Sequence, residues 1–302
     1  MEGTKQETVR SNAAGRDALT LLAFLAVVIL GGSNAVAVRF SNFELPPFWG
    51  AALRFTAAAL IFWIIVLLRR VAFPRGRALT GAIIYGAMTV GIPYAFLYWG
   101  LVTIPASLAI VMLTLGPLVT YLFAWAHHQE TFRWRSILGA VVAFAGILFG
   151  LGTGIGTTIP LLPFAGILFA VIISAEGTVL YKTFPGNDPL MVNALALSTG
   201  AVILLVISLI AGETWHLPGN QATWIAYIYL VIFGSVVMFY SFVYVLNRWT
   251  ASATSYSMLL IPVATFLVAA WLLDEQITLR FLAGSVLVGF GVWLGAISQA
   301  KQ

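Results

Sequence analysis

Glu176 is the residue of this sequence with the clearest capacity for chemistry, because it lies inside a long apolar run. Ionisable side chains at membrane depth are costly to bury and are functional candidates by default. A carboxylate there can take up and release a proton, or hold the amino group of a bound molecule. In the alternative interpretation Glu176 is structural and bonds to a hydroxyl or amide of a neighbouring helix. Both interpretations stay open, and Glu176 is our candidate for proton coupling.

Tyrosines spaced four residues apart form a second group of candidates. Tyr94 and Tyr98 lie on one helix face, as do Tyr240 and Tyr244. Tyrosine combines an apolar ring with a polar tip, which suits small amphipathic molecules. Because aromatic residues make up 14% of the chain, ordinary packing and an interfacial aromatic belt are the alternative. We predict a binding wall that consists of Tyr94, Tyr98, Trp99, Tyr240, Tyr244 and Tyr256.

Ser33 and Asn34 follow two glycines in the first apolar run. Polar groups and irregular backbone at membrane depth are tolerated only where they face protein or water. The corresponding part of the sixth run contains Glu176. We therefore predict a binding site for a small molecule between the first and sixth helices, lined by Ser33, Asn34 and Glu176.

Arg54 lies about two turns inside the second apolar run. It could attract a carboxylate. The favoured interpretation is structural, with the side chain extending outward to water. Alternatively, Arg54 could form a structural ion pair with one of three acidic residues: Glu44, Glu213 or Asp274.

Two further motifs suggest cofactors but do not support them. The segment 127–130 reads His-His-Gln-Glu, yet no other residues with metal-ligand spacing accompany it, so we interpret it as an interfacial loop. The glycine-rich segment 150–156 lacks the strand and the lysine of a phosphate-binding loop. We expect neither a metal nor a cofactor, and we interpret 150–156 as a flexible connection.

The composition is that of a membrane protein. Of the 302 residues, 61% are hydrophobic and 8% are charged, and the mean hydropathy is +1.00. Soluble domains carry about 25% charged residues. The chain has no cysteine, which excludes disulfides and thiolate sites. About 20 apolar residues cross a bilayer as a helix, and ten segments qualify: 18–38, 47–68, 79–102, 106–126, 134–151, 159–182, 190–211, 224–246, 251–273 and 279–299.

The chain contains an internal repeat with an offset of 145 residues, which places Pro117 on Pro262 and Glu130 on Glu275. Each copy has five spans, an odd number, so the second copy must cross the membrane upside down relative to the first. The predicted units are a tail (1–17), a first repeat (18–151), a linker (152–158) and a second repeat (159–302). We therefore predict an all-α integral membrane fold of ten helices in two inverted repeats.

Basic residues predict the orientation, since Lys and Arg collect in cytoplasmic loops. With both termini in the cytoplasm, only Arg39, Arg54 and Arg280 lie toward the outside. The inward residues are then Lys5, Arg10, Arg16, Arg69, Arg70, Arg75, Arg77, Arg133, Arg135, Lys182, Arg248 and Lys301. The net charge of +5 thus reflects membrane topology, and we expect no nucleic-acid partner.

The repeated pattern resembles the drug/metabolite transporter superfamily, specifically ten-helix carriers built from two EamA-type repeats. The pattern is a small-residue start, a mid-helix proline, a glutamate and then glycines. It occurs here as Ala106-Ser107, Pro117, Glu130, Gly139, Gly146 and again as Ala251-Ser252, Pro262, Glu275, Gly284, Gly291. Bacterial aromatic amino acid exporters are the most similar in length and layout.

This resemblance implies a secondary transporter of the bacterial inner membrane that exports amino acids, aromatic or other neutral ones, or related metabolites by alternating access. A drug or nucleotide-sugar carrier is the alternative, and a membrane sensor is a more distant one. We expect no enzyme activity. The expected partners are a small-molecule substrate and the bilayer, and coupling to protons is left open. We expect a monomer, with a dimer as the alternative. Hinges are predicted at three prolines inside spans: Pro93, Pro117 and Pro262.

Overall fold

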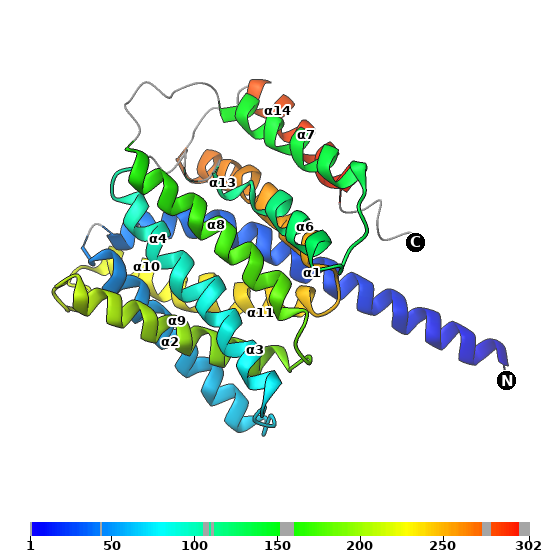
Figure 1. Cartoon of the computed structure of the whole chain (residues 1–302), viewed down its shortest axis with the longest axis horizontal. Helices are drawn as coiled ribbons and strands as arrows, with labels where there is room; N and C mark the ends of the chain where they lie inside the picture. Colours follow the sequence, from blue (N-terminus) through cyan, green and yellow to red (C-terminus); the bar gives the residue numbers. More distant parts are fainter. Residues whose placement is uncertain are drawn as a thin grey trace.

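The computed structural model describes residues 2–42, 44–104, 109, 112–151, 160–273 and 279–295. All regular structure within these residues is helical, and its thirteen α-helices and two π-helical segments join into ten segments. Figure 1 shows their arrangement. This confirms the predicted all-α fold of ten helices. The helices are α1 (Glu2–Asn42), α2 (Pro47–Leu68), α3 (Arg77–Gly86), α4 (Ile92–Leu101), α6 (Gly116–Ala126), α7 (Trp134–Leu151), α8 (Leu161–Tyr181), α9 (Pro189–Ile210), α10 (Gln221–Val231), α11 (Met238–Leu246), α12 (Ala251–Ser255), α13 (Ser257–Leu273) and α14 (Leu279–Gly295).

Two short π-helical segments complete this set, and each joins two α-helices into one span. η1 (Ala87–Gly91) joins α3 to α4, and η2 (Ile232–Val237) joins α10 to α11. Their first residues, Ala87 and Ile232, are 145 residues apart, the offset of the internal repeat. The same local widening of the helix therefore occurs at matching places in both repeats. π-helical turns are rare and are frequent at functional sites.

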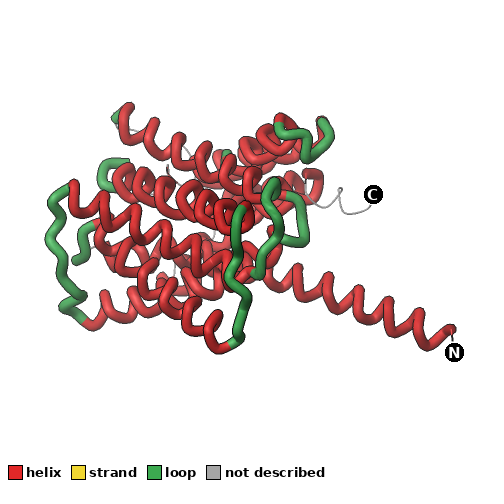
Figure 2. The backbone as a smooth tube through the Cα atoms, turned by 60° about the horizontal axis from the view of Figure 1, so that its bottom comes forward, coloured by secondary structure: helices red, strands yellow, loops and turns green. Residues whose placement is uncertain are grey.

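Within the described part of the chain, five helical segments are long and apolar enough to cross a membrane. They are Pro47–Leu68, Arg77–Leu101, Leu161–Tyr181, Pro189–Ile210 and Gln221–Leu246. Local sequence sets where they begin: prolines occupy the first turn of α2 and α9, and the Asp188 and Asn220 side chains cap α9 and α10. Figure 2 shows the loops gathered at the two ends of the bundle.

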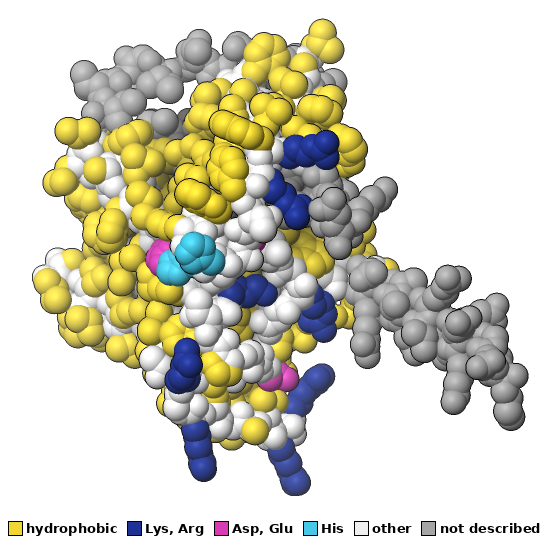
Figure 3. All heavy atoms as spheres, turned by 45° about the vertical axis from the view of Figure 1, so that its right-hand side comes forward, with side chains coloured by type: hydrophobic (Ala, Val, Ile, Leu, Met, Phe, Trp, Pro, Cys, Tyr) yellow, Lys and Arg dark blue, Asp and Glu magenta, His cyan; other side chains and the backbone are white. Residues whose placement is uncertain are grey.

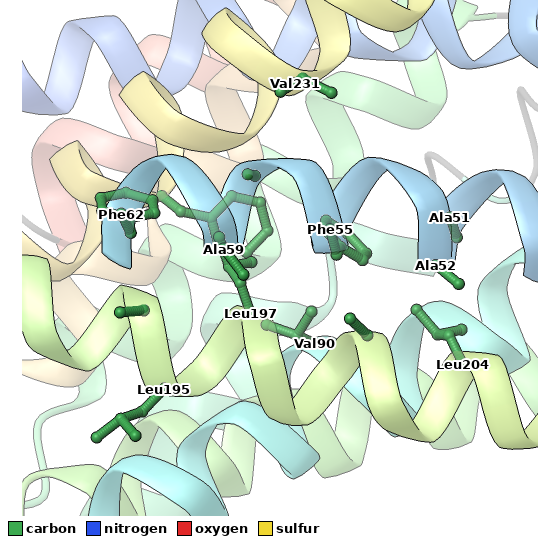
Figure 4. Packing of buried hydrophobic residues seen from close by; sticks show 14 of the residues in the cluster. Ala51, Ala52, Phe55, Ala59, Phe62, Val90, Leu195, Leu197, Leu204 and Val231 are labelled. Carbon is green, nitrogen blue, oxygen red and sulfur yellow. The ribbon is translucent and has the colours of Figure 1, made fainter. Parts of the chain in front are cut away.

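Contacts between α2 and α9 show that the repeats are inverted. The backbone N–H of Phe48, at the start of α2, donates to Glu213, just after the end of α9. Trp63, late in α2, donates to Ser198, in the middle of α9. The start of α2 thus lies beside the end of α9, so these two repeat mates run antiparallel. The packing is close because α2 presents small residues and phenylalanines to α9, with Ala51, Ala52, Phe55, Ala59 and Phe62 labelled in Figure 4.

α7 and α14 repeat this symmetry through glycines. A Cβ added at Gly146 would lie 2.8 Å from the carbonyl oxygen of Gly284, and one at Gly291 would lie 2.5 Å from that of Gly139. Gly146 and Gly291 are repeat mates, as are Gly139 and Gly284. The two backbones can approach this closely only without side chains, so the glycines serve packing within the bundle.

α1 and α8 each pack against the opposite repeat. α1 contacts α13, α11 and α10 of the second repeat, whereas α8 contacts α4, α6 and α3 of the first (Figure 1). The two halves are therefore interlocked by their first helices.

One end of the bundle carries most of the described basic side chains (Figure 3). We name this the basic end; its described members are Arg69, Arg70, Arg75, Arg77, Arg133, Arg135, Lys182 and Arg248. Its assignment to the cytoplasm remains a prediction from charge. Arg39, Arg280 and the termini lie outside the described side chains, as do Ala106, Ser107, Asp274, Glu275 and the linker 152–158.

Candidate functional site

A buried arginine bonds to the π-helical segment η2 in the interior of the bundle. Arg54 of α2 is 2% exposed. Its Nε donates to Ser235 Oγ at 2.7 Å, and its Nη2 donates to the Gly234 carbonyl at 2.8 Å. Placing an arginine at the centre of a membrane helix costs about 3 kcal/mol on insertion scales. These bonds offset part of that cost and tie α2 of the first repeat to η2 of the second.

Asn34 of α1 converges on the same backbone carbonyl. Its Nδ2 donates to Gly234 O at 3.1 Å, while its Oδ1 is buried and has no hydrogen-bond partner among the described residues. A Cβ at Gly234 would lie 2.0 Å from Asn34 Oδ1. Only glycine therefore permits this approach. One carbonyl of η2 thus receives donors from α1 and α2.

Aromatic rings form one side of this polar group. Tyr94 of α4 packs edge-on against Phe55 at 4.8 Å, lies 6.2 Å from the Tyr98 ring and 6.3 Å from Phe239. The hydroxyls of Tyr94 and Tyr98 lie close enough to Arg54 to interact with its charge. We call the resulting group the Arg54 cluster: Asn34, Arg54, Tyr94, Tyr98, Gly234 and Ser235.

Among the described residues, Arg54 has neither of the surroundings that we expected for a structural arginine. The side chain does not extend to water, and neither of its described acidic candidates pairs with it. Glu213 accepts the N–H groups of Phe48 and Trp49, at 3.1 and 2.7 Å. Asp274 lies outside the described residues.

Glu44 belongs to the end of the bundle opposite the basic end. Its carboxylate accepts the Gly219 N–H at 2.6 Å and the Asn220 amide at 2.8 Å. The Thr223 side chain and then the Gly219 N–H hold the pKa of Glu44 below its usual range. Glu44 therefore links the α1–α2 connection to the start of α10.

Ser33 and the second tyrosine pair lie in different surroundings. The Ser33 hydroxyl bonds to the Tyr229 hydroxyl of α10. Tyr240 and Tyr244 are 6.1 Å apart on α11, and the guanidinium of Arg248 lies 3.5 Å from the Tyr244 ring centre. This pair therefore points to the basic end and is separate from the Arg54 cluster.

Glu176 pairs with a histidine from the other repeat. Glu176 Oε1 lies 2.8 Å from His127 Nε2, which follows α6, and the two side chains are 21% and 33% exposed. Glu176 Oε2 is buried without a partner among the described residues. The interpretation of His127 as a simple loop residue missed this pair. Asn34 bonds to η2 and Glu176 bonds to His127, so the structure gives these two residues different partners, and a shared site between the first and sixth helices stays a prediction.

Trp99 and Tyr256 lie in packing interfaces away from the Arg54 cluster, contrary to the predicted wall. The Trp99 ring covers Gly166 of α8, where an added Cβ would lie 2.8 Å from it. Tyr256 is 1% exposed and donates to the Ser136 carbonyl at 3.0 Å. Burial among apolar residues explains both positions.

The three prolines differ in their surroundings. Pro93 is the second residue of α4, which follows η1, and Pro117 lies in the first turn of α6, after a turn at 114–115. Pro262 lies inside the uninterrupted α13. The structure thus places irregular backbone beside the first two, and hinge motion remains a prediction for all three.

Sequence reasoning missed Gly234, Ser235 and His127 as members of these polar groups. A lone glycine inside a span gave no indication of η2, and pairs 49 to 200 residues apart leave no local pattern. The repeat did contain one signal for the Arg54 cluster. The residues that align with Arg54, Asn34 and Ser235 in the other copy are of a different type.

The model of the EamA-like transporter family matches residues 18–151 and again residues 162–296. The chain belongs to the EamA-like transporter family. The two matches correspond to two repeats of this family. The protein is therefore a multi-pass membrane transporter, as the resemblance implied.

Relatives extend over most of this EamA-family chain. An uncharacterized transporter of Archaeoglobus fulgidus is 27% identical and covers 88% of this chain and 95% of its own. The uncharacterized inner membrane transporter YedA of Escherichia coli is 28% identical, over 88% of this chain and 87% of its own. A protein crystal structure shares the fold, with a TM-score of 0.76 and 21% identity over 92% of this chain and 98% of its own.

Proposed function

We propose that this transporter exports amino acids, aromatic or other neutral ones, or closely related small metabolites across the inner membrane of a bacterium. The observation that supports this most directly is the Arg54 cluster. It combines a buried positive charge, neutral polar groups and tyrosine rings, which together match a polar head and an apolar body. Both repeats contribute to it.

Alternating access is the proposed mechanism, because inverted repeats can exchange conformations and so open one end at a time. In this structure hydrogen bonds join neighbouring elements at both ends of the bundle. At the basic end, Tyr181 donates to Asn247 at 3.1 Å and Asn247 donates to the Asn187 carbonyl at 3.2 Å. At the opposite end, Glu213 joins α9 to α2. Each set would break in turn while the Arg54 cluster holds the substrate.

Counterflow in proteoliposomes tests this proposal. Vesicles loaded with unlabelled solute would be offered labelled L-phenylalanine, L-leucine, UDP-glucose or the cationic dye ethidium. We expect counterflow of the amino acids alone. Asn34→Ala should reduce it about tenfold, since it removes a polar group of the site, whereas Asn42→Ala, at the exposed end of α1, should not. Counterflow of UDP-glucose or ethidium without the amino acids would contradict the proposal in favour of the other superfamily substrates.

A further inference from the structure

Arg54 is a buried positive charge without a negative partner in the described part of the chain. Guanidinium stays charged at every physiological pH, and buried charges in proteins are normally paired. Arg54 is 2% exposed, yet the only ion pair found among the described residues joins His127 to Glu176.

The described acidic side chains are all bonded elsewhere, so none of them supplies the missing charge. Each accepts a hydrogen bond from another group: Glu44 from Gly219, Glu130 from Ser252, Glu176 from His127, Asp188 from Leu190 and Glu213 from Trp49. A bound anion would complete the charge balance of the cluster.

The guanidinium keeps donors for such an anion. Nε and Nη2 bond to Ser235 and to the Gly234 carbonyl, while Nη1 makes no hydrogen bond within the described residues. The Tyr98 hydroxyl interacts with the guanidinium through its oxygen, and a hydroxyl that accepts one hydrogen bond can still donate another. A carboxylate matches the planar fork of arginine better than any other common organic anion except phosphate.

Asn34 provides a neutral acceptor close to this positive charge. Its Oδ1 is unpartnered, and the side chain is only 9% exposed. The amide orientation is fixed, because Nδ2 donates to the Gly234 carbonyl and the flipped form would place two oxygens together. An amino group could donate to Oδ1, but no described carboxylate faces the cluster to neutralise it.

We infer that Arg54 binds the carboxylate of the substrate and that Asn34 Oδ1 accepts a hydrogen bond from its amino group. This inference rests on the proposed function and narrows it. The substrate class is small monocarboxylates with an apolar or aromatic body, amino acids among them. The carboxylate is required, whereas the amino group strengthens binding without being essential.

Four probes that share a phenyl ring and differ in their polar groups separate these contributions: L-phenylalanine, 3-phenylpropionate, 2-phenylethylamine and L-phenylalaninamide. Their binding to the full chain in detergent would be measured by tryptophan fluorescence. We expect the two carboxylates to bind about 10- to 100-fold more tightly than the two amines. In Arg54→Gln this preference should disappear. Arg75→Gln, in an exposed loop of the basic end, is the matched control and should retain it.

Equal affinity for 3-phenylpropionate and 2-phenylethylamine would overturn the inference, and so would a preference that survives in Arg54→Gln. Failure of both carboxylates to bind monodisperse wild-type protein would also overturn it. The wild-type comparison decides even if Arg54→Gln does not fold. If the carboxylates bind through Arg54 but proteoliposomes transport no amino acid, the carboxylate site stands and the proposed function falls.

Discussion

The contact between Glu176 and His127 joins two titratable groups from different repeats. Imidazole is the side chain whose charge ordinarily changes near neutral pH. The 2.8 Å contact links α8 to the end of α6, and the second carboxylate oxygen of Glu176 is buried and unpartnered. This contact between the two repeats therefore consists of side-chain types that can exchange protons, and Glu176 stays the candidate for proton coupling.

We therefore predict that Glu176→Gln uncouples transport from protons. If the wild-type protein exchanges one proton for each substrate molecule, a gradient of one pH unit can sustain about a tenfold ratio of substrate concentrations across the proteoliposome membrane. Glu176→Gln and His127→Gln should transport without responding to an imposed pH gradient, as measured by labelled L-phenylalanine flux. His128→Gln, the exposed neighbour, should respond like wild type. A wild-type flux that ignores the gradient would remove this role.

η2 is the element on which the Arg54 cluster depends. The Gly234 carbonyl accepts hydrogen bonds from both Arg54 and Asn34. The Gly234 Cα lies against the Asn34 amide. The matched segment η1 begins 145 residues earlier in the chain but lacks these polar partners among the described residues. The backbone device is thus symmetric, and the chemistry is placed in one copy only.

Gly234→Ala should displace Asn34, because the new Cβ would lie 2.0 Å from its Oδ1. Overpacking of this kind costs about 1–3 kcal/mol, and we expect a lower Tm together with lost transport. Gly289→Ala on α14 is the control, since no atom lies within 4 Å of its added Cβ. It should be neutral or slightly stabilising. A Gly234→Ala protein with wild-type Tm and flux would contradict this role of η2.

The helices could be predicted from sequence because hydropathy and the internal repeat indicate the same spans independently of each other. The offset from Pro117 to Pro262 identified repeat mates whose antiparallel packing the structure confirms through Phe48 and Glu213. The Arg54 cluster could not be predicted. Its contacts depend on η2, which has no sequence signature, and on which helices of opposite repeats meet.

At the scale of the whole molecule, the end opposite the basic end must open if access alternates. Trp49 and Trp215 stack there with ring centres 4.8 Å apart. The chain has no cysteine, so in a Trp49→Cys/Trp215→Cys variant the two introduced thiols are the only ones that a cross-linker can join. A short thiol cross-linker should reduce flux at least about tenfold, with reduction restoring it. Each single variant treated alike is the control, and undiminished flux in the locked protein would show that this end does not move.

The same end should show a pH-dependent stability through Glu44. Its pKa is lowered on folding, so its contribution is present above the unfolded value and is lost as the pH falls through the folded value. The Tm of wild type should exceed that of Glu44→Gln at about pH 7, and the difference should shrink as the pH falls through the acid range. A constant difference across this range would show that the charge of Glu44 is not what stabilises the connection.

The interlocked first helices have a consequence for synthesis. Asn34 and its acceptor Gly234 are 200 residues apart. At about 5–20 residues per second, a ribosome needs about 10–40 s to make the intervening chain. During this time the Asn34 amide of α1 lacks the carbonyl to which it donates in the folded protein. A chain that stalls before η2 leaves α1 in this state, where membrane quality control can recognise it.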